Sequence, residues 1–328
     1  MTIPKLGKVG LVACGGGYKV AFTIGVCKCL TYLGIDISIV SAVSGSALTL
    51  AAWIADDFQT KRLEEEDKKI DSFGDNFVFN KKYIRLAMHL NENSLFGSDG
   101  LLMLINGKKE AGLGGINIQK LLESKTELCI ALRNETDENK RECISNLDSQ
   151  FKKNPQKLKL YLQATASPMG FLQPVKIDES FYSDGMYPDI ECAIQSGCDT
   201  IFIIYNEQPP IDHIETLSWL KRLPYNISTM HDDIMEKEIE KILKTHHDFV
   251  LIEGNSKTPW VKRCYKYFSA IAASAKRGDT HNFVPHRIIV LSPEKPMGKI
   301  STVGFDRGDL QTALQHGYDC TLKAIENL

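Results

Sequence analysis

Two strand-to-helix turns within residues 10–50 constrain the fold of this chain more than any other feature. The first is the glycine triplet Gly15-Gly16-Gly17, which follows a short apolar run and precedes helical periodicity over residues 20–33. The second is Ser44-Gly45-Ser46, which follows a β-prone run over residues 35–43 and precedes another apolar segment. A strand–turn–helix unit that occurs twice in succession predicts an α/β layer fold with a mostly parallel sheet.

The rest of the chain continues the alternation of strands and helices. We expect residues 56–157 to be a helical and loop insertion over the first layer, with the polar run NETDENKRE exposed. No internal repeat or long linker is seen, so residues 1–328 are expected to form a single domain. Further strands are expected at 158–164, 200–205, 248–252 and 286–291, and helices at 190–197, 213–247, 265–276 and 310–328.

Composition narrows the classes of partner. The net charge of −2 provides no basic field for nucleic acid, and no apolar run is long enough to span a bilayer. The N-terminus lacks the apolar stretch of a signal peptide. The nine cysteines form no paired C-x-x-C modules, which favours reduced thiols and no metal site. We therefore expect a cytoplasmic protein whose contact with membranes is peripheral.

The turn at Ser44 has the features of a nucleophile site. A serine hydroxyl becomes an acyl-transfer nucleophile when a sharp strand-to-helix turn exposes it and backbone donors hold the oxyanion that forms. A strict elbow reads G-x-S-x-G, whereas Ala42 and Ser46 occupy the glycine positions here. Residues 15–17 lack Cβ atoms, so their N–H groups can approach an anion closely.

The glycine triplet has an alternative interpretation as a nucleotide loop. The dinucleotide fingerprint needs a glycine where this chain has Val20, and the P-loop pattern is absent, so this alternative is disfavoured. Lys19 beside the triplet could support the loop or attract an anionic head group. A solvated lysine is an equally good interpretation.

The sequence offers two kinds of base for Ser44. Several histidines follow Asp184, which fits the order of an α/β-hydrolase triad, but Ser44 comes after too few strands for that fold. Each histidine is better explained as a surface or structural residue. Asp184-Gly185 follows an interruption of the strand pattern, so we expect its carboxylate at a sheet edge. The carboxylate could act as a base if desolvation raised its proton affinity. A turn-forming aspartate is the simpler interpretation of that pair.

Taken together, these motifs resemble those of the patatin-like phospholipases, lipid acyl hydrolases with a Ser–Asp dyad. The resemblance rests on GGGYK at 15–19, AVSGS at 42–46, ASPMGF at 166–171, SDGM at 183–186 and GYD at 317–319. It implies a three-layer α/β/α patatin-like fold. It also implies that Ser44 is the nucleophile, that Asp184 is the base, and that the amides of Gly15, Gly16 and Gly17 form the oxyanion hole.

The resemblance further implies the substrate class and raises one question. The substrate would be a phospholipid or another acyl-ester lipid, cleaved in the manner of a phospholipase A or lysophospholipase, without a cofactor or metal. Ala42, Val20 and Met186 stand where the family often has glycine. These departures leave open a need for an activating protein partner, or a non-catalytic lipid-binding or regulatory protein on the same scaffold.

Overall fold

The computed structural model describes residues 4–74, 77, 96–137, 140–207, 219–246, 249–252, 262, 264, 286–297, 299–300 and 304–328. The helix expected at 265–276 lies outside these residues. The strands are β1 (Val9–Ala13), β2 (Ile37–Ala42), β3 (Glu127–Asn134), β4 (Lys140–Ser145), β5 (Val175–Ile177), β6 (Ser180–Asp184), β7 (Thr200–Ile204), β8 (Phe249–Ile252) and β9 (His286–Leu291). The helices are α1 (Ala21–Tyr32), α2 (Ser44–Ala55), α3 (Lys61–Phe73), α5 (Asp99–Asn106), α6 (Ile118–Glu123), α7 (Ser149–Lys153), α8 (Gln156–Thr165), α9 (Ile190–Gln195), α10 (Trp219–Thr245) and α12 (Asp309–Glu326), with short 3-10 turns at Gly17–Val20 and Lys109–Ala111.

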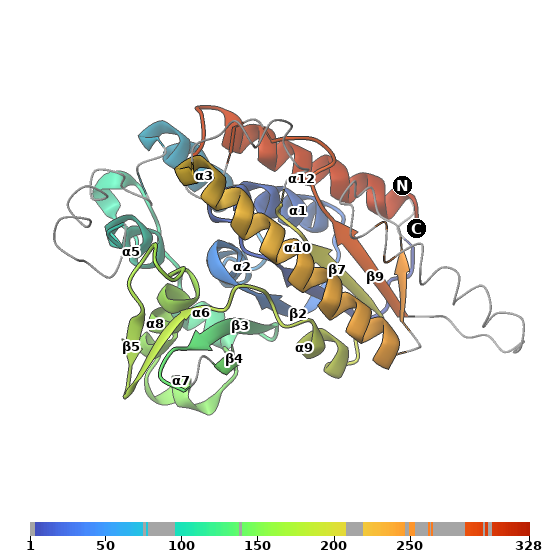
Figure 1. Cartoon of the computed structure of the whole chain (residues 1–328), viewed down its shortest axis with the longest axis horizontal. Helices are drawn as coiled ribbons and strands as arrows, with labels where there is room; N and C mark the ends of the chain where they lie inside the picture. The colour runs from blue at the N-terminus through green and yellow to red at the C-terminus, as the bar shows by residue number, and fades with distance from the viewer. Residues whose placement is uncertain are drawn as a thin grey trace, which may run out of the picture.

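The strands of the described residues form one mixed sheet. Its order is β5-β6-β3-β2-β1-β7-β9-β8, and β4 pairs with β3 beside this path (Figure 1). The pairs from β3 through β2, β1, β7 and β9 to β8 are parallel. The pairs β3–β4, β3–β6 and β5–β6 are antiparallel. The expected mostly parallel sheet is confirmed, with an antiparallel end that carries β6.

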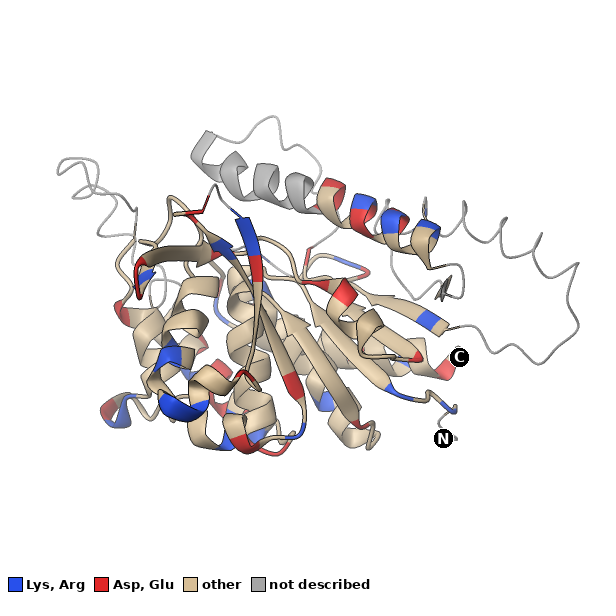
Figure 2. Cartoon of the chain, turned by 90° about the horizontal axis from the view of Figure 1, so that it is seen from below, with Lys and Arg blue, Asp and Glu red and all other residues tan. Residues whose placement is uncertain are grey.

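Helices cover both faces of the sheet, which confirms the expected three layers (Figure 2). Side chains of α1, α2, α8 and α12 join one apolar core, whereas α9 and α10 join the other. In β7, Phe202 and Ile204 face the first core, and Ile201 and Ile203 face the second. Because both faces are buried, the central strands are continuously apolar and do not alternate with polar residues. No helix among the described residues is both long enough and apolar enough to cross a bilayer.

Two expectations for the middle of the chain were wrong. Residues 158–164 were expected to be a strand, but they belong to α8, which buries Leu158, Tyr161, Leu162 and Thr165 at helical spacing. The helical and loop insertion expected at 56–157 contains β3, a buried strand between β2 and β6. One strand of the sheet, β3, therefore comes from a segment that was expected to be helix and loop because polar residues follow it.

Helices α1 and α12 pack at unusually short range (Figure 1). A Cβ atom built at Gly25 would lie 1.9 Å from the Leu314 carbonyl oxygen, and one at Gly317 would lie 2.1 Å from the Phe22 carbonyl oxygen. The neighbouring atoms are backbone, so neither helix can yield by rotating a side chain. This contact requires glycine on both helices.

We expect Gly25→Ala to lower the free energy of unfolding by about 3 kcal/mol, at the upper end of the cost of overpacking. In an exposed helix the same change would stabilise by roughly 1 kcal/mol through helix propensity, so the sign itself reports the close contact. Denaturant unfolding followed by circular dichroism measures it. Gly34→Ala is the comparison variant, because nothing lies within 4 Å of that position and alanine there adds only the strain of a φ of 65°, so it should cost less than Gly25→Ala. A stabilised Gly25→Ala variant would contradict the packing.

Candidate active site

Ser44 lies at the sharp turn between β2 and α2, at the carboxyl end of the central strands. Its φ of 58° is in the left-handed region, which is costly for a residue with a side chain. Its backbone N–H donates to Thr165 Oγ1 at 3.0 Å, and that hydroxyl donates to the Ala131 carbonyl at 2.8 Å. The end of α8 therefore holds the strained turn in place. The sequence did not single out Thr165, because the residues directly before it, 158–164, were expected to form a strand.

The glycine triplet lies directly against Ser44. A Cβ atom at Gly15 would lie 2.7 Å from the Ser44 Cβ and 3.3 Å from its Oγ, so only glycine fits there. Gly16 and Gly17 have positive φ values of 148° and 57°. Glycine adopts such backbone conformations without the steric cost that a Cβ atom brings. The two turns predicted from the sequence thus meet at one place.

Asn206, just after β7, holds the other side of the glycine loop. Its Nδ2 donates to the carbonyls of Cys14 at 2.7 Å and Gly15 at 3.2 Å. In a trans peptide the carbonyl and the following N–H point in opposite directions. Fixing the Gly15 carbonyl on Asn206 therefore directs the Gly16 N–H away from Asn206. Asn206 is a positioning residue that sequence analysis missed, since it lies far along the chain.

A buried hydroxyl pair completes this network. Ser46 Oγ donates to the Cys14 carbonyl at 2.7 Å, and Thr23 Oγ1 donates to Asn206 Oδ1 at 3.0 Å. The two hydroxyl oxygens lie 3.2 Å apart. Ser46, which replaces an elbow glycine, thus uses its side chain to join the serine turn to the glycine loop.

Lys19 is buried in an ion pair with Glu207, so its interpretation as a solvated lysine was wrong. It lies in the 3-10 turn between the glycine loop and α1, while Glu207 follows β7 directly after Asn206. The pair ties the loop to the β7 side of the sheet. Of the roles expected for Lys19, support of the loop is the one that this ion pair fits, and it stays a prediction.

Asp184 ends β6 and is nearly buried. Its N–H donates to the Ser167 carbonyl at 3.1 Å, and its Oδ1 accepts the Met186 N–H at 2.8 Å. In the register of the sheet, Asp184 is opposite Leu132 of β3. A Cβ atom at Gly185 would lie 2.6 Å from the Ala131 carbonyl carbon, so the turn after Asp184 packs directly on β3.

Ser44 and Asp184 therefore lie at the same end of the sheet. Ala42, two residues before Ser44, pairs with Ile130 of β3. Asp184 pairs two residues farther along that strand, and Ala131 between them accepts the Thr165 hydroxyl that holds the serine turn. β3 thus supports both predicted catalytic residues.

Two of the glycine replacements have visible consequences. Met186 has a φ of 67°, a conformation that favours the glycine often found there. Val20 packs against the serine turn, since its Cγ1 would lie 3.0 Å from a Cβ atom at Gly45. Ala42, the third replacement, is fully buried at the end of β2.

Three histidines have structural contacts among the described residues. His246 Nε2 lies 3.2 Å from Glu191 Oε1, and His286 Nδ1 lies 3.1 Å from the Cys198 carbonyl. His316 Nε2 accepts the Glu294 N–H at 3.3 Å. These contacts agree with the expectation that these three histidines are structural.

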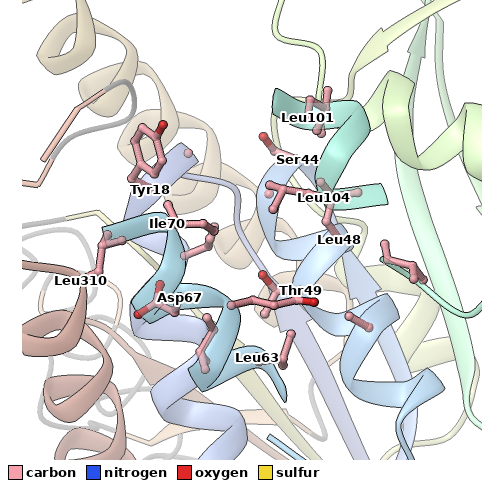
Figure 3. A pocket seen from close by; sticks show the side chains of 18 residues that line it. Tyr18, Ser44, Leu48, Thr49, Leu63, Asp67, Ile70, Leu101, Leu104 and Leu310 are labelled. Carbon is pink, nitrogen blue, oxygen red and sulfur yellow. The ribbon is translucent and has the colours of Figure 1, made fainter. Parts of the chain in front are cut away.

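A pocket opens beside Ser44 on the α2 side of the sheet (Figure 3). Its walls come from the turn after Gly17 and from α2, α3, α5 and α12. Most of its lining side chains are aliphatic, including Leu48, Leu63, Ile70, Leu101, Leu104 and Leu310. A pocket of this kind fits a hydrocarbon chain better than a sugar or a nucleotide.

Two carboxyl groups, those of Glu66 and Asp67, interrupt the apolar wall. Asp67 is buried, accepts a hydrogen bond from Gln311 Nε2 at 2.9 Å, and is seen among the leucines of Figure 3. Burial, and then the charges of Asp71 and Glu64, raise the pKa of Asp67 to about 7. The pocket therefore gains a negative charge as the pH rises through neutrality.

We expect Asp67 to make the protein less stable as the pH rises from about 4 to about 7. Its folded-state pKa of about 7 exceeds the usual 3.8, so the folded state binds more protons in this range and the free energy of unfolding falls. At roughly 1.4 kcal/mol per pKa unit, the loss amounts to about 4 kcal/mol at most.

Melting temperatures of Asp67→Asn across that range test the assignment, because asparagine keeps the hydrogen bond and cannot ionise. The variant should lose less stability with rising pH than the original protein. Asp137→Asn, at an exposed ion pair with Lys140, is the control and should follow the original protein. Parallel curves for Asp67→Asn and the original protein would contradict the assignment.

Comparison with known proteins relates this geometry to one family. The family model of the patatin-like phospholipases matches residues 11–187, a range that contains the glycine triplet, Ser44 and Asp184. No curated protein sequence is significantly similar to the chain. Among solved structures, VipD from Legionella pneumophila is similar with a TM-score of 0.46 and 14% identity, covering 99% of this chain and 68% of VipD.

Proposed function

The chain belongs to the patatin-like phospholipase family, and from this we propose that it is a serine lipid acyl hydrolase of the phospholipase A or lysophospholipase kind. Membership of the family supports hydrolysis of lipids in general. The proposal adds a Ser44–Asp184 dyad, a phospholipid or other acyl ester as substrate, and peripheral contact with membranes. A cytoplasmic location and an activating protein partner belong to the same proposal.

In the proposed reaction, Ser44 Oγ attacks the ester carbonyl while the Asp184 carboxylate takes its proton. The oxyanion of the tetrahedral intermediate accepts hydrogen bonds from backbone N–H groups of Gly15, Gly16 and Gly17. The intermediate collapses to an acyl-enzyme, and Asp184 returns the proton to the leaving alcohol. Water, activated by Asp184, then hydrolyses the acyl-enzyme and releases the fatty acid.

The observation that carries the proposal is the position of Ser44. It occupies a strained turn that opens on an apolar pocket, and the backbone of Gly15 lies against its side chain. Such a turn costs of order 1–3 kcal/mol and persists only where its surroundings hold it. Strain at a serine beside a pocket for a hydrocarbon chain supports nucleophilic attack on an acyl group.

A fluorophosphonate probe followed by mass spectrometry tests the nucleophile, and Asp184→Asn tests the base. We expect the probe to label Ser44 of the original protein. We expect Asp184→Asn to lower kcat for fatty-acid release by roughly 10²- to 10⁴-fold, the usual contribution of a general base. The amide can still accept the Met186 N–H, so the fold should persist.

Asp178→Asn is the matched control for this experiment, because Asp178 is exposed and pairs only with Lys157 among the described contacts. It should release fatty acid at the original rate. Labelling at another residue, or full activity in Asp184→Asn, would overturn the proposed dyad.

The second candidate is a non-catalytic lipid-binding or regulatory protein on the same scaffold. The observation that favours it is the left-handed conformation of Met186, two residues after the proposed base, at a position better suited to glycine. This candidate predicts binding to phospholipid vesicles that is the same in the original protein and in Ser44→Ala, together with no release of fatty acid by either. Turnover that depends on Ser44 would exclude it.

A further inference from the structure

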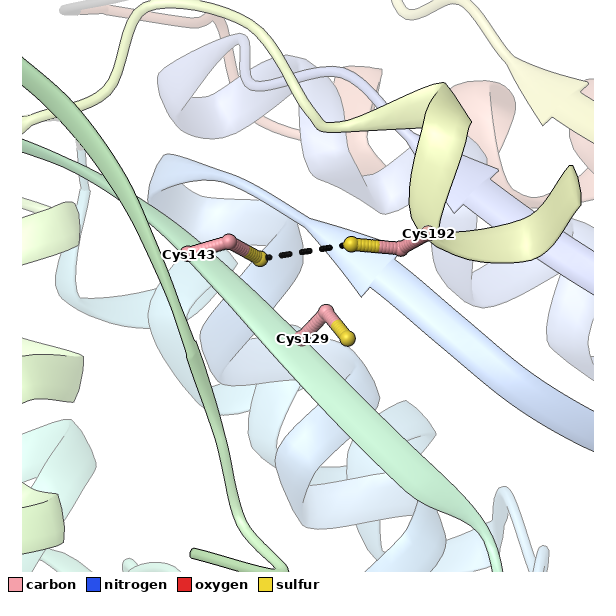
Figure 4. A group of neighbouring side chains, drawn as sticks. All are labelled: Cys129, Cys143 and Cys192. Atoms are coloured by element: carbon pink, nitrogen blue, oxygen red, sulfur yellow. Dashed lines mark hydrogen bonds between the residues drawn. The ribbon is translucent and has the colours of Figure 1, made fainter. Parts of the chain in front are cut away.

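Three cysteine sulfur atoms meet on the face of the sheet opposite the pocket. Cys129 lies on β3, Cys143 on β4 and Cys192 on α9, and their three Sγ atoms lie within 4.8 Å of one another (Figure 4). The side chains contact the apolar core formed with α9 and α10, whereas Ser44 begins a helix of the other core. The proposed reaction uses none of these thiols.

The distances fit a metal–thiolate site. Zinc binds cysteine sulfur at about 2.3 Å with tetrahedral geometry, so two such sulfurs lie about 3.8 Å apart. The Sγ atoms of Cys143 and Cys192 are 3.7 Å apart. A disulfide would require a separation of about 2 Å. At 3.7 Å the Cys192 thiol is within hydrogen-bonding distance of Cys143 Sγ, and the same separation suits two sulfurs that share a metal ion.

Rigid elements hold the three sulfurs in this arrangement. In the antiparallel pairing of β3 with β4, Cys129 is opposite Ser145. Cys143 lies two residues before Ser145 on β4, so the side chains of Cys129 and Cys143 are on the same face of the sheet. The start of α9 is fixed by Asp189, whose N–H donates to Ser41 Oγ at 2.9 Å. Sites built on strands and helices keep their geometry better than sites built on loops.

The N-terminus of α9 is capped by Asp189, whose Oδ1 accepts the Glu191 N–H at 3.1 Å. This cap fixes the helix that carries Cys192, three residues after Asp189. The cysteines belong to three elements separated by up to 63 positions in the sequence, so no short motif could have revealed the cluster.

We propose that Cys129, Cys143 and Cys192 bind one Zn²⁺ ion, with a water molecule in the fourth position. Soft thiolate ligands in tetrahedral geometry select this ion over magnesium or calcium. Bound zinc would join β3 and β4 to α9, the helix that follows Asp184 in the chain. The sequence had predicted no metal site, because the spacing of the cysteines matches no zinc motif.

The test uses the full chain, reduced and stripped of metal by a chelator. Titration with Co²⁺ should give the absorption bands of a tetrahedral thiolate site, saturating at one ion per chain, and Zn²⁺ should abolish them by competition. Zinc should also raise the melting temperature, because a ligand that binds the folded state stabilises it. Both readouts are independent of lipid hydrolysis.

Cys143→Ser and Cys192→Ser should lose the cobalt bands and the zinc-dependent rise in melting temperature, while circular dichroism shows a folded protein. Cys320→Ser is the matched control, because Cys320 is a buried thiol of α12 in the opposite core. It should keep both signals. The proposal is overturned if the reduced original protein gives no tetrahedral thiolate bands, or if the two variants bind cobalt as it does.

A redox pair is the competing outcome. If the protein contains a Cys143–Cys192 disulfide as purified, and binds no Co²⁺ after complete reduction, the cluster is a disulfide-forming pair and the zinc proposal is wrong. Failure of this proposal leaves the Ser44–Asp184 proposal intact, because the fluorophosphonate reaction and fatty-acid release are measured separately.

Discussion

Ser44→Ala will lower kcat for fatty-acid release by roughly four to six orders of magnitude, as loss of a serine nucleophile does in other hydrolases. Only Ser44 Oγ can form the proposed acyl-enzyme, and the oxyanion hole alone retains little of the rate. The measurement is release of fatty acid from mixed phospholipid vesicles and from lysophospholipid. Fluorophosphonate labelling of the same variant should be absent.

The backbone at Ser44 provides an internal check on this result. Alanine at a φ of 58° keeps the strain of the turn, whereas glycine relieves it. Ser44→Gly should therefore be as inactive as Ser44→Ala and should melt at a higher temperature than Ser44→Ala. Ser149→Ala, an exposed serine at the start of α7, should keep full activity. Activity within tenfold of the original in both Ser44 variants would remove this residue from the mechanism.

Gly15→Ala will lower kcat by roughly 10²- to 10³-fold, the usual cost of losing an oxyanion-hole donor. The added methyl group would lie 2.7 Å from the Ser44 Cβ, so the loop and the serine turn must move apart. Substrate binding in the apolar pocket does not depend on this contact. The Michaelis constant should therefore change much less than kcat.

Gly34→Ala separates this effect from a general loss of stability. Gly34 has a φ of 65° and nothing within 4 Å, so alanine there adds backbone strain without a clash. We expect a cost of about 1–2 kcal/mol in unfolding free energy and an unchanged kcat. If Gly15→Ala lowered stability but kept kcat, the glycine loop would be structural rather than part of an oxyanion hole.

The first two strand–helix units could be predicted from the sequence because their signals are local. The apolar runs, the glycine triplet and Ser44 mark the ends of β1, α1 and β2 to within a few residues. The strands of residues 200–205 and 286–291 were equally clear, because a strand buried on both faces is a short continuous apolar run.

The region of α8 shows why other predictions failed. Leu158, Leu160 and Leu162 alternate as in a strand, but Tyr161 is also buried and Leu160 is 39% exposed, which is a helical pattern. A short segment can satisfy both periods, and tertiary packing decides between them. The strand β3 was missed for another reason, since its apolar residues are followed by a polar stretch that dominates the local composition.

The contacts that hold the candidate site could not be predicted at all. Thr165 lies 121 positions from Ser44, whose backbone N–H donates to it. Asn206 lies 191 positions from Gly15, whose carbonyl accepts its side-chain hydrogen bond. Neither threonine nor asparagine stands out in sequence when it follows a helix or a strand end. The same is true of the leucines on α3, α5 and α12 that complete the pocket, because each helix alone shows only one apolar side.

The contacts made by Asn206 and Glu207 mean that the sequence motifs alone are not enough to form the candidate site. Both residues fall after residue 187, where the match to the family model ends, yet they hold the loop at Gly15 and its neighbour Lys19. A fragment that ended at residue 187 would contain the glycine triplet, Ser44 and Asp184 but would lack these two contacts. In this molecule residues after 187 help to shape the reaction centre, although residues 15–184 contribute all of its proposed chemistry.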